Sequence, residues 1–153
     1  IADEPTTALD VTIQAQILEL MQSLQKKMGM AVILVTHDLG VIADMCDNII
    51  VMYGGRICER GTAREIFYNP KHEYTKGLLR SIPNVNNMKE KLIPIAGTPI
   101  NVLNLPKGCK FAPRCKYCQQ RCLEEEPELV NVTEEQQVRC FYPRKEERRA
   151  NLK

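Results

Sequence analysis

The sequence predicts an α/β fold with a small cysteine-rich extension at its C-terminal end. Three observations support this: a helical pattern leads directly into a β-branched run, a glycine pair joins two more strand-like runs, and the cysteines cluster late in the chain. Alternating helix and strand patterns are typical of α/β domains. We expect an α/β part over residues 1–81, a connector over 82–106, a cysteine-rich module over 107–143 and a charged tail over 144–153.

The first predicted helix covers residues 11–27. Its apolar side chains recur at intervals of three and four and form one stripe, made of Ile13, Ile17, Leu20, Met21, Leu24 and Met28. Asp10 is a good N-cap for this helix, and Gly29 ends it. The run Ala-Val-Ile-Leu-Val-Thr over residues 31–36 is continuous and β-branched, which predicts a strand buried on both faces of a mostly parallel sheet.

A second helix is predicted from the N-cap Asp38 to about Cys46. Strand-like runs over residues 48–53 and 56–60 flank a Gly-Gly pair, a strong signal for a two-residue hairpin. Two short helices are expected next, over residues 62–67 and 73–80. Four prolines then punctuate the chain up to Pro106, as expected of a connector.

The composition gives no sign of a nucleic-acid-binding protein or of a membrane-spanning segment. Of the 153 residues, 44% are hydrophobic and 26% are charged, and the net charge is +2. This balance gives no electrostatic reason to expect nucleic-acid binding. No apolar run approaches the roughly 18 residues that span a bilayer, so we expect any membrane role to depend on a partner protein.

Two adjacent carboxylates, Asp3 and Glu4, stand where a buried strand would end. Such a pair suits phosphate chemistry, because one group can hold the magnesium shell while the other orients or deprotonates a water. By itself the pair is weak evidence, because two solvated acids in a loop are the commoner explanation of such a pair. His37, which follows the predicted strand, is by itself compatible with a structural role.

The longer string Asp3-Glu4-Pro5-Thr6-Thr7-Ala8-Leu9-Asp10 resembles the Walker B end and D-loop of ABC ATPases, and His37 resembles their switch histidine. The helix and strand between these motifs match that family. The resemblance implies a partial P-loop NTPase fold over residues 1–81. It implies these roles: Asp3 binds the magnesium of ATP, Glu4 is the general base, His37 contacts the γ-phosphate, and Ala8, Leu9 and Asp10 face a second ATPase subunit.

No G-x-x-x-x-G-K-[ST] phosphate loop occurs in the sequence. In ABC ATPases this loop precedes Walker B. We therefore expect the chain to be truncated before Walker B and to be inactive by itself.

Residues 69–79, beginning Asn-Pro-Lys-His-Glu-Tyr-Thr, resemble a segment of oligopeptide, dipeptide and nickel importer ATPases. The resemblance implies an ATPase subunit for peptide import, peripheral on the cytoplasmic face of the inner membrane. Its implied partners are a second ATPase subunit, transmembrane permease subunits and, indirectly, an extracytoplasmic peptide-binding protein, without nucleic acid. The alternatives are an importer of nickel or another small solute, a soluble ABC ATPase acting on nucleic acid or ribosomes, and a non-catalytic metal-binding or interaction fragment.

Five of the seven cysteines lie between Cys109 and Cys140, spaced C-x5-C-x2-C-x3-C with the last after a further seventeen residues. Converging thiolates suit tetrahedral zinc or an iron–sulfur cluster, and the spacing does not choose between them. Reduced, metal-free thiols are the remaining alternative. Cys46 and Cys58 stand in apolar contexts and are expected to be small buried hydrophobic residues.

The cysteine segment also resembles the C-terminal extension of the peptide-importer ATPases. That resemblance implies a [4Fe–4S] cluster, with Zn²⁺ as the alternative, held by Cys109, Cys115, Cys122 and Cys140. Cys118 departs from the pattern of that family. It is a bystander, an alternative ligand, or a sign that the set of four is assigned wrongly.

Overall fold

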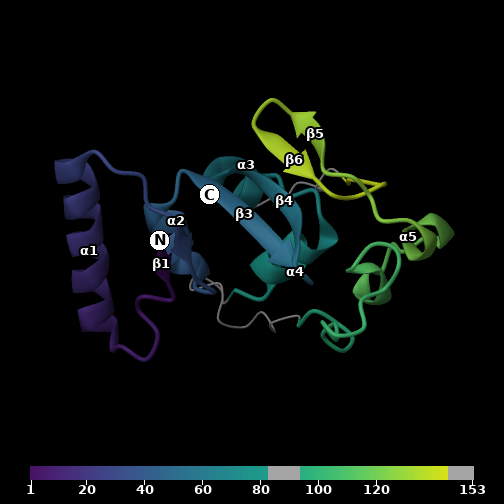
Figure 1. Cartoon of the computed structure of the whole chain (residues 1–153), viewed down its shortest axis with the longest axis horizontal. Helices are drawn as coiled ribbons and strands as arrows, with labels where there is room; N and C mark the ends of the chain where they lie inside the picture. The colour runs from purple at the N-terminus through teal and green to yellow at the C-terminus, as the bar shows by residue number, and fades with distance from the viewer. Residues whose placement is uncertain (83–93, 145–153) are drawn as a thin grey trace. The chain divides into compact units, whose positions relative to one another are not determined.

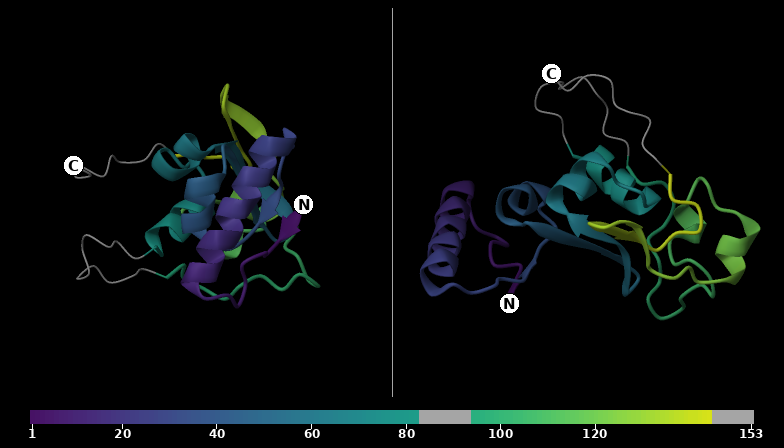
Figure 2. Two further views of the ribbon diagram at one scale, coloured as in Figure 1. Left: turned by 90° about the vertical axis from the view of Figure 1, so that its left-hand side faces the viewer. Right: turned by 90° about the horizontal axis from the view of Figure 1, so that it is seen from above.

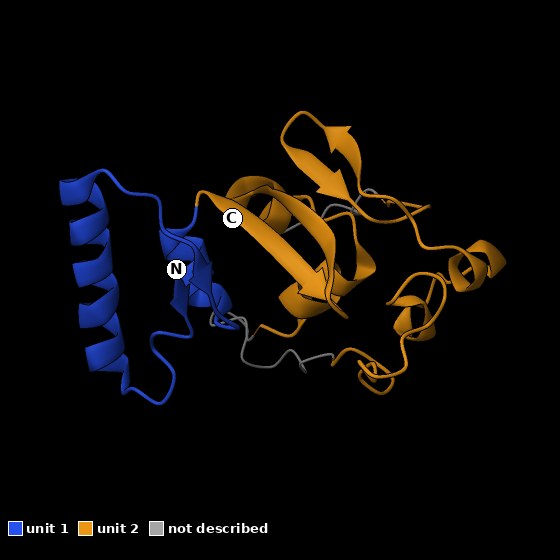
Figure 3. Cartoon of the chain, viewed as in Figure 1, with its two compact units in different colours: residues 1–46 blue, residues 47–153 orange. Residues whose placement is uncertain are grey.

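The chain forms two compact units, residues 1–46 and residues 47–153 (Figure 3). The computed structural model describes residues 1–82 and 94–144. The first unit contains β1 (Ala2–Asp3), α1 (Val11–Met28), β2 (Leu34–Val35) and α2 (Leu39–Met45). The second contains β3 (Asn48–Tyr53), β4 (Arg56–Thr62), α3 (Ala63–Tyr68), α4 (Glu73–Arg80), the 3₁₀ turn η1 (Ala112–Arg114), α5 (Gln120–Glu124), β5 (Val130–Thr133) and β6 (Gln136–Val138) (Figure 1).

Both predicted caps of α1 are confirmed. The Asp10 carboxylate accepts hydrogen bonds from the backbone N–H groups of Thr12 and Ile13, each at 3.0 Å. These bonds satisfy two of the donors that a helix leaves unpaired at its first turn. Gly29 ends the helix in the left-handed conformation at φ 62°, which costs glycine little because it has no Cβ.

The prediction of a fully buried strand over residues 31–36 is wrong for this structure. Only Leu34 and Val35 form a ladder, and Ile33 and Val35 are 60% and 48% exposed. Within the described residues, β2 pairs with β1 alone, in parallel, so it is an edge strand of a two-stranded sheet. The apolar stripe of α1 behaves in the same way, because no residue of this helix is buried.

The predicted hairpin is confirmed. Strands β3 and β4 pair antiparallel, and β4 runs two residues further than expected, to Thr62. Gly54 and Gly55 both have positive φ, 55° and 74°, as a tight turn matched to the strand twist requires. Helices α3 and α4 follow within one residue of their predicted bounds, capped by Thr62 and His72.

The hairpin is extended by strands from much later in the chain. The second sheet has the order β3-β4-β6-β5, so the hairpin β5–β6 adds to the free edge of β4 (Figures 1 and 2). In this register Gly61 lies opposite Gln136. A Cβ at Gly61 would stand 2.8 Å from the Glu135 carbonyl oxygen, so the close approach of the two strands requires glycine.

The core of the second unit joins this sheet to the cysteine-rich segment. It is built on the buried side chains of Tyr53, Cys58 and Phe111. The Tyr53 and Phe111 rings meet edge to face, with centroids 5.3 Å apart, and Tyr74 of α4 packs 5.4 Å from Phe111. Aromatic pairs of this kind add about 0.5–1.5 kcal/mol each beyond area burial. The cysteine-rich segment is therefore packed into the second unit rather than hanging from it.

Candidate functional site

The first candidate site lies at one end of the parallel β1–β2 pair. Parallel pairing places the carboxyl ends of both strands at the same edge, and the Glu4 N–H continues the ladder to the Val35 carbonyl at 2.8 Å. There His37 Nδ1 lies 2.9 Å from Glu4 Oε1. The Thr7 hydroxyl donates to the other carboxylate oxygen, Oε2, at 2.8 Å. Two motifs far apart in the sequence thus meet in one hydrogen-bonded pair.

The electrostatics keep Glu4 ionised. The hydrogen bond with His37, followed by the one from Thr7, lowers the pKa of the Glu4 carboxyl below its usual range. The His37 and Glu4 side chains are 79% and 43% exposed, so solvent reaches both groups. An ionised carboxylate beside an imidazole can orient a water and accept its proton.

The backbone around this pair is strained. Glu4 and Ala8 have φ of 44° and 63°, the left-handed region that residues other than glycine rarely adopt. Such conformations concentrate at functional sites, where surrounding contacts hold them. The turn sets the Glu4 carboxylate beside His37 and leads through Ala8 and the exposed Leu9 into the Asp10 cap.

Asp38 links the two helices of the first unit. Its carboxylate caps α2 by accepting from Gly40 N–H at 2.9 Å, and it accepts from the Gln14 amide of α1 at 3.2 Å. Burial raises the pKa of Asp38, but the hydrogen bonds from Val41, Gln14 and Gly40 lower it further than burial raises it. The sequence predicted the cap but not Gln14, which carries no signal beyond its place on α1. Asp3, also predicted for the site, is the exposed last residue of β1.

The second candidate site is a cavity of about 30 Å³ in the second unit. Four cysteines line it: Cys109, Cys115, Cys122 and Cys140. These are the four that the sequence singled out, brought together from the loop before η1, from its C-cap, from α5 and from the residues after β6. Cys118 is not among the residues that line this cavity.

A backbone contact fixes two of these cysteines. The Cys109 N–H donates to the Cys122 carbonyl at 2.8 Å. The preceding Gly108 lies so close to α5 that a Cβ there would overlap the Cys122 carbonyl oxygen and stand 2.7 Å from the Leu123 carbonyl carbon. Glycine at 108 is therefore a condition for pairing the two segments.

Three of the four thiols that line this cavity have raised pKa values. Burial raises the pKa of Cys109 and Cys140, and raises that of Cys115 to about 11. Neighbouring cysteines add to each shift, as Cys122 does for Cys109. Because metals bind thiolates, any metal that enters must displace these protons.

The described residues hold no group of three His, Cys, Asp or Glu side chains arranged to hold a metal ion. A tetrahedral zinc site with Zn–S bonds of about 2.3 Å requires sulfurs roughly 3.8 Å apart. The four cysteines thus line one cavity, but the described residues do not form a recognisable metal-ion site there.

Sequence reasoning missed a polar network behind the cavity. Glu59 is fully buried, and its carboxylate accepts from the N–H groups of Lys71 and His72 at 2.6 and 3.0 Å and from the Gln136 amide at 2.8 Å. Desolvation raises the pKa of Glu59, and these hydrogen bonds oppose the rise. An acid inside a strand pattern was the available signal, because a buried carboxylate needs partners.

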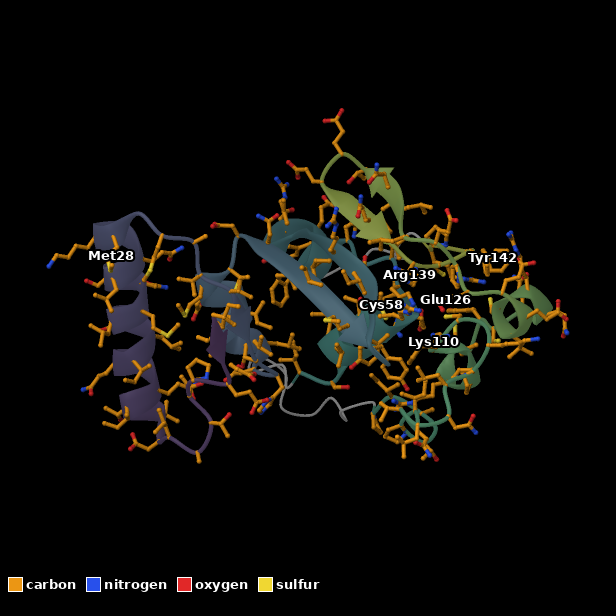
Figure 4. All side chains as sticks on the ribbon, viewed as in Figure 1. Met28, Cys58, Lys110, Glu126, Arg139 and Tyr142 are labelled. Carbon is orange, nitrogen blue, oxygen red and sulfur yellow. The ribbon has the colours of Figure 1, made fainter. Side chains whose placement is uncertain are left out.

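A cluster of partly exposed charges centres on Glu126. Its carboxylate lies 2.9 Å from Arg56 Nε, 3.0 Å from Lys110 Nζ and 4.0 Å from Arg139 (Figure 4). Arg139 also donates to the Ile57 carbonyl at 2.9 Å. Charge clusters of this kind fix the segment after α5 against β4.

No helix among residues 1–82 and 94–144 combines the length and apolar character needed to cross a bilayer.

Comparison with known proteins identifies the class. The oligopeptide transport ATP-binding protein OppD of Haemophilus influenzae is 49% identical over 141 residues, covering 92% of this chain and 43% of that protein. The dipeptide transport ATP-binding protein DppD of Escherichia coli is 49% identical over 143 residues, 94% of this chain and 44% of its own length. The chain is therefore similar, over most of its length, to less than half of each of these transport ATP-binding proteins.

Two further matches point in the same direction. Residues 58–122 match the family described as the C-terminal region of oligopeptide/dipeptide transporters. A putative peptide import ATP-binding protein of Brucella ovis is 53% identical over 147 residues, 92% of this chain and 44% of that protein. Over most of its length the chain is similar to these peptide transport ATP-binding proteins, and it spans less than half the length of these relatives.

Proposed function

We propose that this chain is part of an ATPase subunit that powers peptide import through a membrane ABC transporter. The observation that carries the proposal is the contact between Glu4 and His37, 2.9 Å apart at the edge of a parallel strand pair. The peptide transport functions of the relatives support the choice of solute. The subunit would work on the cytoplasmic face of the cell membrane, against permease subunits, a second ATP-binding subunit and, indirectly, a peptide-binding protein.

Each residue of the first site has a role in this proposal. Asp3 would complete the oxygen shell of the magnesium ion that accompanies ATP. Glu4, ionised beside His37, would orient the attacking water and accept its proton. His37 would donate from Nδ1 to Glu4. In the neutral ring Nε2 would then accept from water, and in the protonated ring Nε2–H would donate to the terminal phosphate. Ala8, Leu9 and Asp10 would face the second subunit.

The test uses the full-length subunit that contains these residues, reconstituted with its permease in vesicles. Glu4→Gln should lower ATP hydrolysis at least about 100-fold while ATP still binds, because the amide cannot accept the proton. Glu19→Gln, on the exposed surface of α1, is the matched control. Unchanged hydrolysis in Glu4→Gln would refute the assignment. Peptide uptake without nickel uptake would support the proposed solute. A polypeptide of residues 1–153 alone, which carries no phosphate-loop motif, should not bind ATP tightly.

We also propose that the cysteine cavity holds a metal centre, and that this centre is a [4Fe–4S] cluster rather than Zn²⁺. The donor chemistry fits, since four cysteines with unbridged thiols line one cavity. The support for the cluster is this donor chemistry together with the resemblance of the cysteine segment to the C-terminal extension of the peptide-importer ATPases. Bound there, the cluster would supply a structural staple or a redox-active group.

Metal analysis after anaerobic purification tests this second proposal. About four irons and four sulfides per chain, with visible absorption, are the expected result. One zinc without sulfide would replace the cluster by a structural zinc site. Absence of both metals when oxygen has been excluded throughout would refute a metal centre.

A further inference from the structure

The residues that follow Cys140 form part of the wall of the cysteine cavity. Phe141, Tyr142 and Arg144 all line it, and they belong to one stretch, residues 141–144, that comes after β6. The backbone N–H of Tyr142 donates to the Cys140 sulfur, so this stretch contacts a cavity thiol. We call residues 141–144 the strap.

Tyr117 lines the cavity from a different segment, the loop between η1 and α5. Its backbone N–H donates to the Cys115 sulfur. The Arg144 guanidinium lies over the Tyr117 ring, with its central carbon 3.6 Å from the ring centroid. This cation–π contact therefore joins two segments that each hold a cavity thiol.

Two further side chains hold the strap. The guanidinium carbon of Arg121, in α5, lies 4.0 Å from the centroid of the Phe141 ring. Lys76 of α4 is 5% exposed and donates from Nζ to the Arg144 carbonyl at 3.2 Å. The strap is thus held by contacts from α4, from α5 and from the loop before α5.

The cation–π contacts of the strap are made at the surface, because Tyr117, Arg121 and Arg144 are all exposed. At exposed sites such a contact shifts an equilibrium by roughly two- to fivefold. The cavity is also lined by Cys122, which is only 8% exposed. A weakly held segment over a buried thiol is an arrangement in which local opening controls the reactivity of the thiol.

We propose that the strap controls the access of small thiol-reactive molecules to the cysteine cavity, and that the Arg144–Tyr117 contact is its latch. The closed strap keeps such molecules from Cys122, and opening of the latch admits them. The inference concerns the thiols themselves, so it does not depend on the metal centre or on the ATPase activity proposed above.

Alkylation with iodoacetamide tests the latch in the full-length subunit that contains this chain, treated with a chelator under anaerobic conditions. The thiolate sulfur displaces iodide and gains an acetamide group, and peptide mass spectrometry measures this modification at each cysteine. The reaction at Cys122 requires an open strap, so its rate follows the population of the open form. Cys118 does not line the cavity and is the internal reference.

Arg144→Gln removes the cation from the Tyr117 ring, so we expect Cys122 to react about two- to fivefold faster while Cys118 keeps its rate. Tyr117→Leu removes the other half of the same contact and should accelerate Cys122 equally. Lys116→Gln is the matched control. Lys116 also lies over the Tyr117 ring, at 4.8 Å, but it is not part of the strap, so its loss should leave Cys122 at the wild-type rate.

Wild-type rates at Cys122 in both Arg144→Gln and Tyr117→Leu would overturn the inference, as would an equal acceleration by Lys116→Gln. An equal acceleration of Cys118 would also overturn it, because that result means general loosening of the unit rather than local opening.

Hydrogen exchange in the wild-type protein guards against variants that fail to fold. The backbone amides of the strap should exchange faster than those of β6, which pairs with β4 and β5. Exchange as slow in the strap as in β6 would show that the strap does not open by itself and would overturn the inference.

Discussion

The two units of the chain differ in the solvent exposure of their hydrogen-bonded polar residues. In the first unit, His37 and Glu4 are 79% and 43% exposed, and no residue of α1 is buried. In the second unit, Glu59, His72 and Gln136 are at most 3% exposed, and the His72 backbone N–H and the Gln136 amide both donate to the Glu59 carboxylate. Exposed pairs contribute about 0–1 kcal/mol, whereas breaking a buried hydrogen bond costs roughly 1–3 kcal/mol.

This difference in exposure separates residues proposed to act on ATP, which are exposed to solvent, from residues that stabilise the fold, which are buried. A two-residue ladder and a tight turn hold Glu4 and His37 together. Both side chains are exposed, so water can reach them. The Glu59 network joins β4, the N-terminus of α4 and β6, so its loss should loosen the whole cavity wall. Substitutions should therefore affect stability strongly in the second unit and weakly in the first.

The largest expected effect is that of Glu59→Gln. The amide would turn an N–H group toward donors that now point at a carboxylate, so we expect a loss of about 3 kcal/mol in the free energy of unfolding. Urea unfolding measures it. Glu19→Gln, on the exposed surface of α1, should stay within about 0.5 kcal/mol of wild type. If both substitutions changed the free energy of unfolding equally, the proposed difference between the buried network and the exposed helix surface would be wrong.

Gly108→Ala should cost about 2 kcal/mol, because the new Cβ would collide with the backbone of α5. The Cys109–Cys122 contact would open, and in a titration with Co²⁺ the thiolate-to-metal absorption band of the cavity should weaken with it. Gly55→Asn is the control, since a Cβ at Gly55 meets nothing within 4 Å and asparagine tolerates positive φ. An intact Co²⁺ band in Gly108→Ala would show that the close approach is dispensable.

Asp10→Ala should destabilise α1 by about 1 kcal/mol, because it removes the acceptor for two first-turn N–H groups. Amide hydrogen exchange should speed up in α1 and stay unchanged in β3 and β4. Asp10→Asn, which keeps an acceptor oxygen, should restore most of the protection. Faster exchange throughout the second unit would contradict a local role for this cap.

The smallest expected effect is on the titration of Glu4. Its folded pKa is depressed, so the hydrogen bonds to His37 and Thr7 contribute fully above the ordinary carboxyl pKa and are lost as pH falls through the folded value. ¹³C NMR of the Glu4 carboxyl should show this lowered midpoint. Thr7→Val removes one donor and should raise the midpoint toward the ordinary value. An unchanged midpoint would mean that Thr7 does not hold the carboxylate.

Much of the local structure was predictable, since caps and turns depend on neighbouring residues. Asp10, Gly29 and the Gly54-Gly55 turn were all predicted correctly, and so was the start of α4 at Glu73. Burial was predicted less well. Met28 belongs to a convincing apolar stripe and is nevertheless 68% exposed (Figure 4), because a pattern shows which face is apolar but not whether anything covers it.

The sequence by itself determined the caps of α1, the turn between β3 and β4, and helices α3 and α4, because hydrogen bonds between neighbouring residues fix them. The motifs at Asp3-Glu4 and His37 and the set of four cysteines came from the family resemblance. Only the tertiary structure decided that β6 pairs with β4, that Glu59 serves as the buried acceptor for the loop before α4, and that His72 shares the cysteine cavity. These contacts join residues as far apart as 59 and 136. Such pairings depend on which surfaces meet once the chain is compact, which periodicity along the sequence does not record.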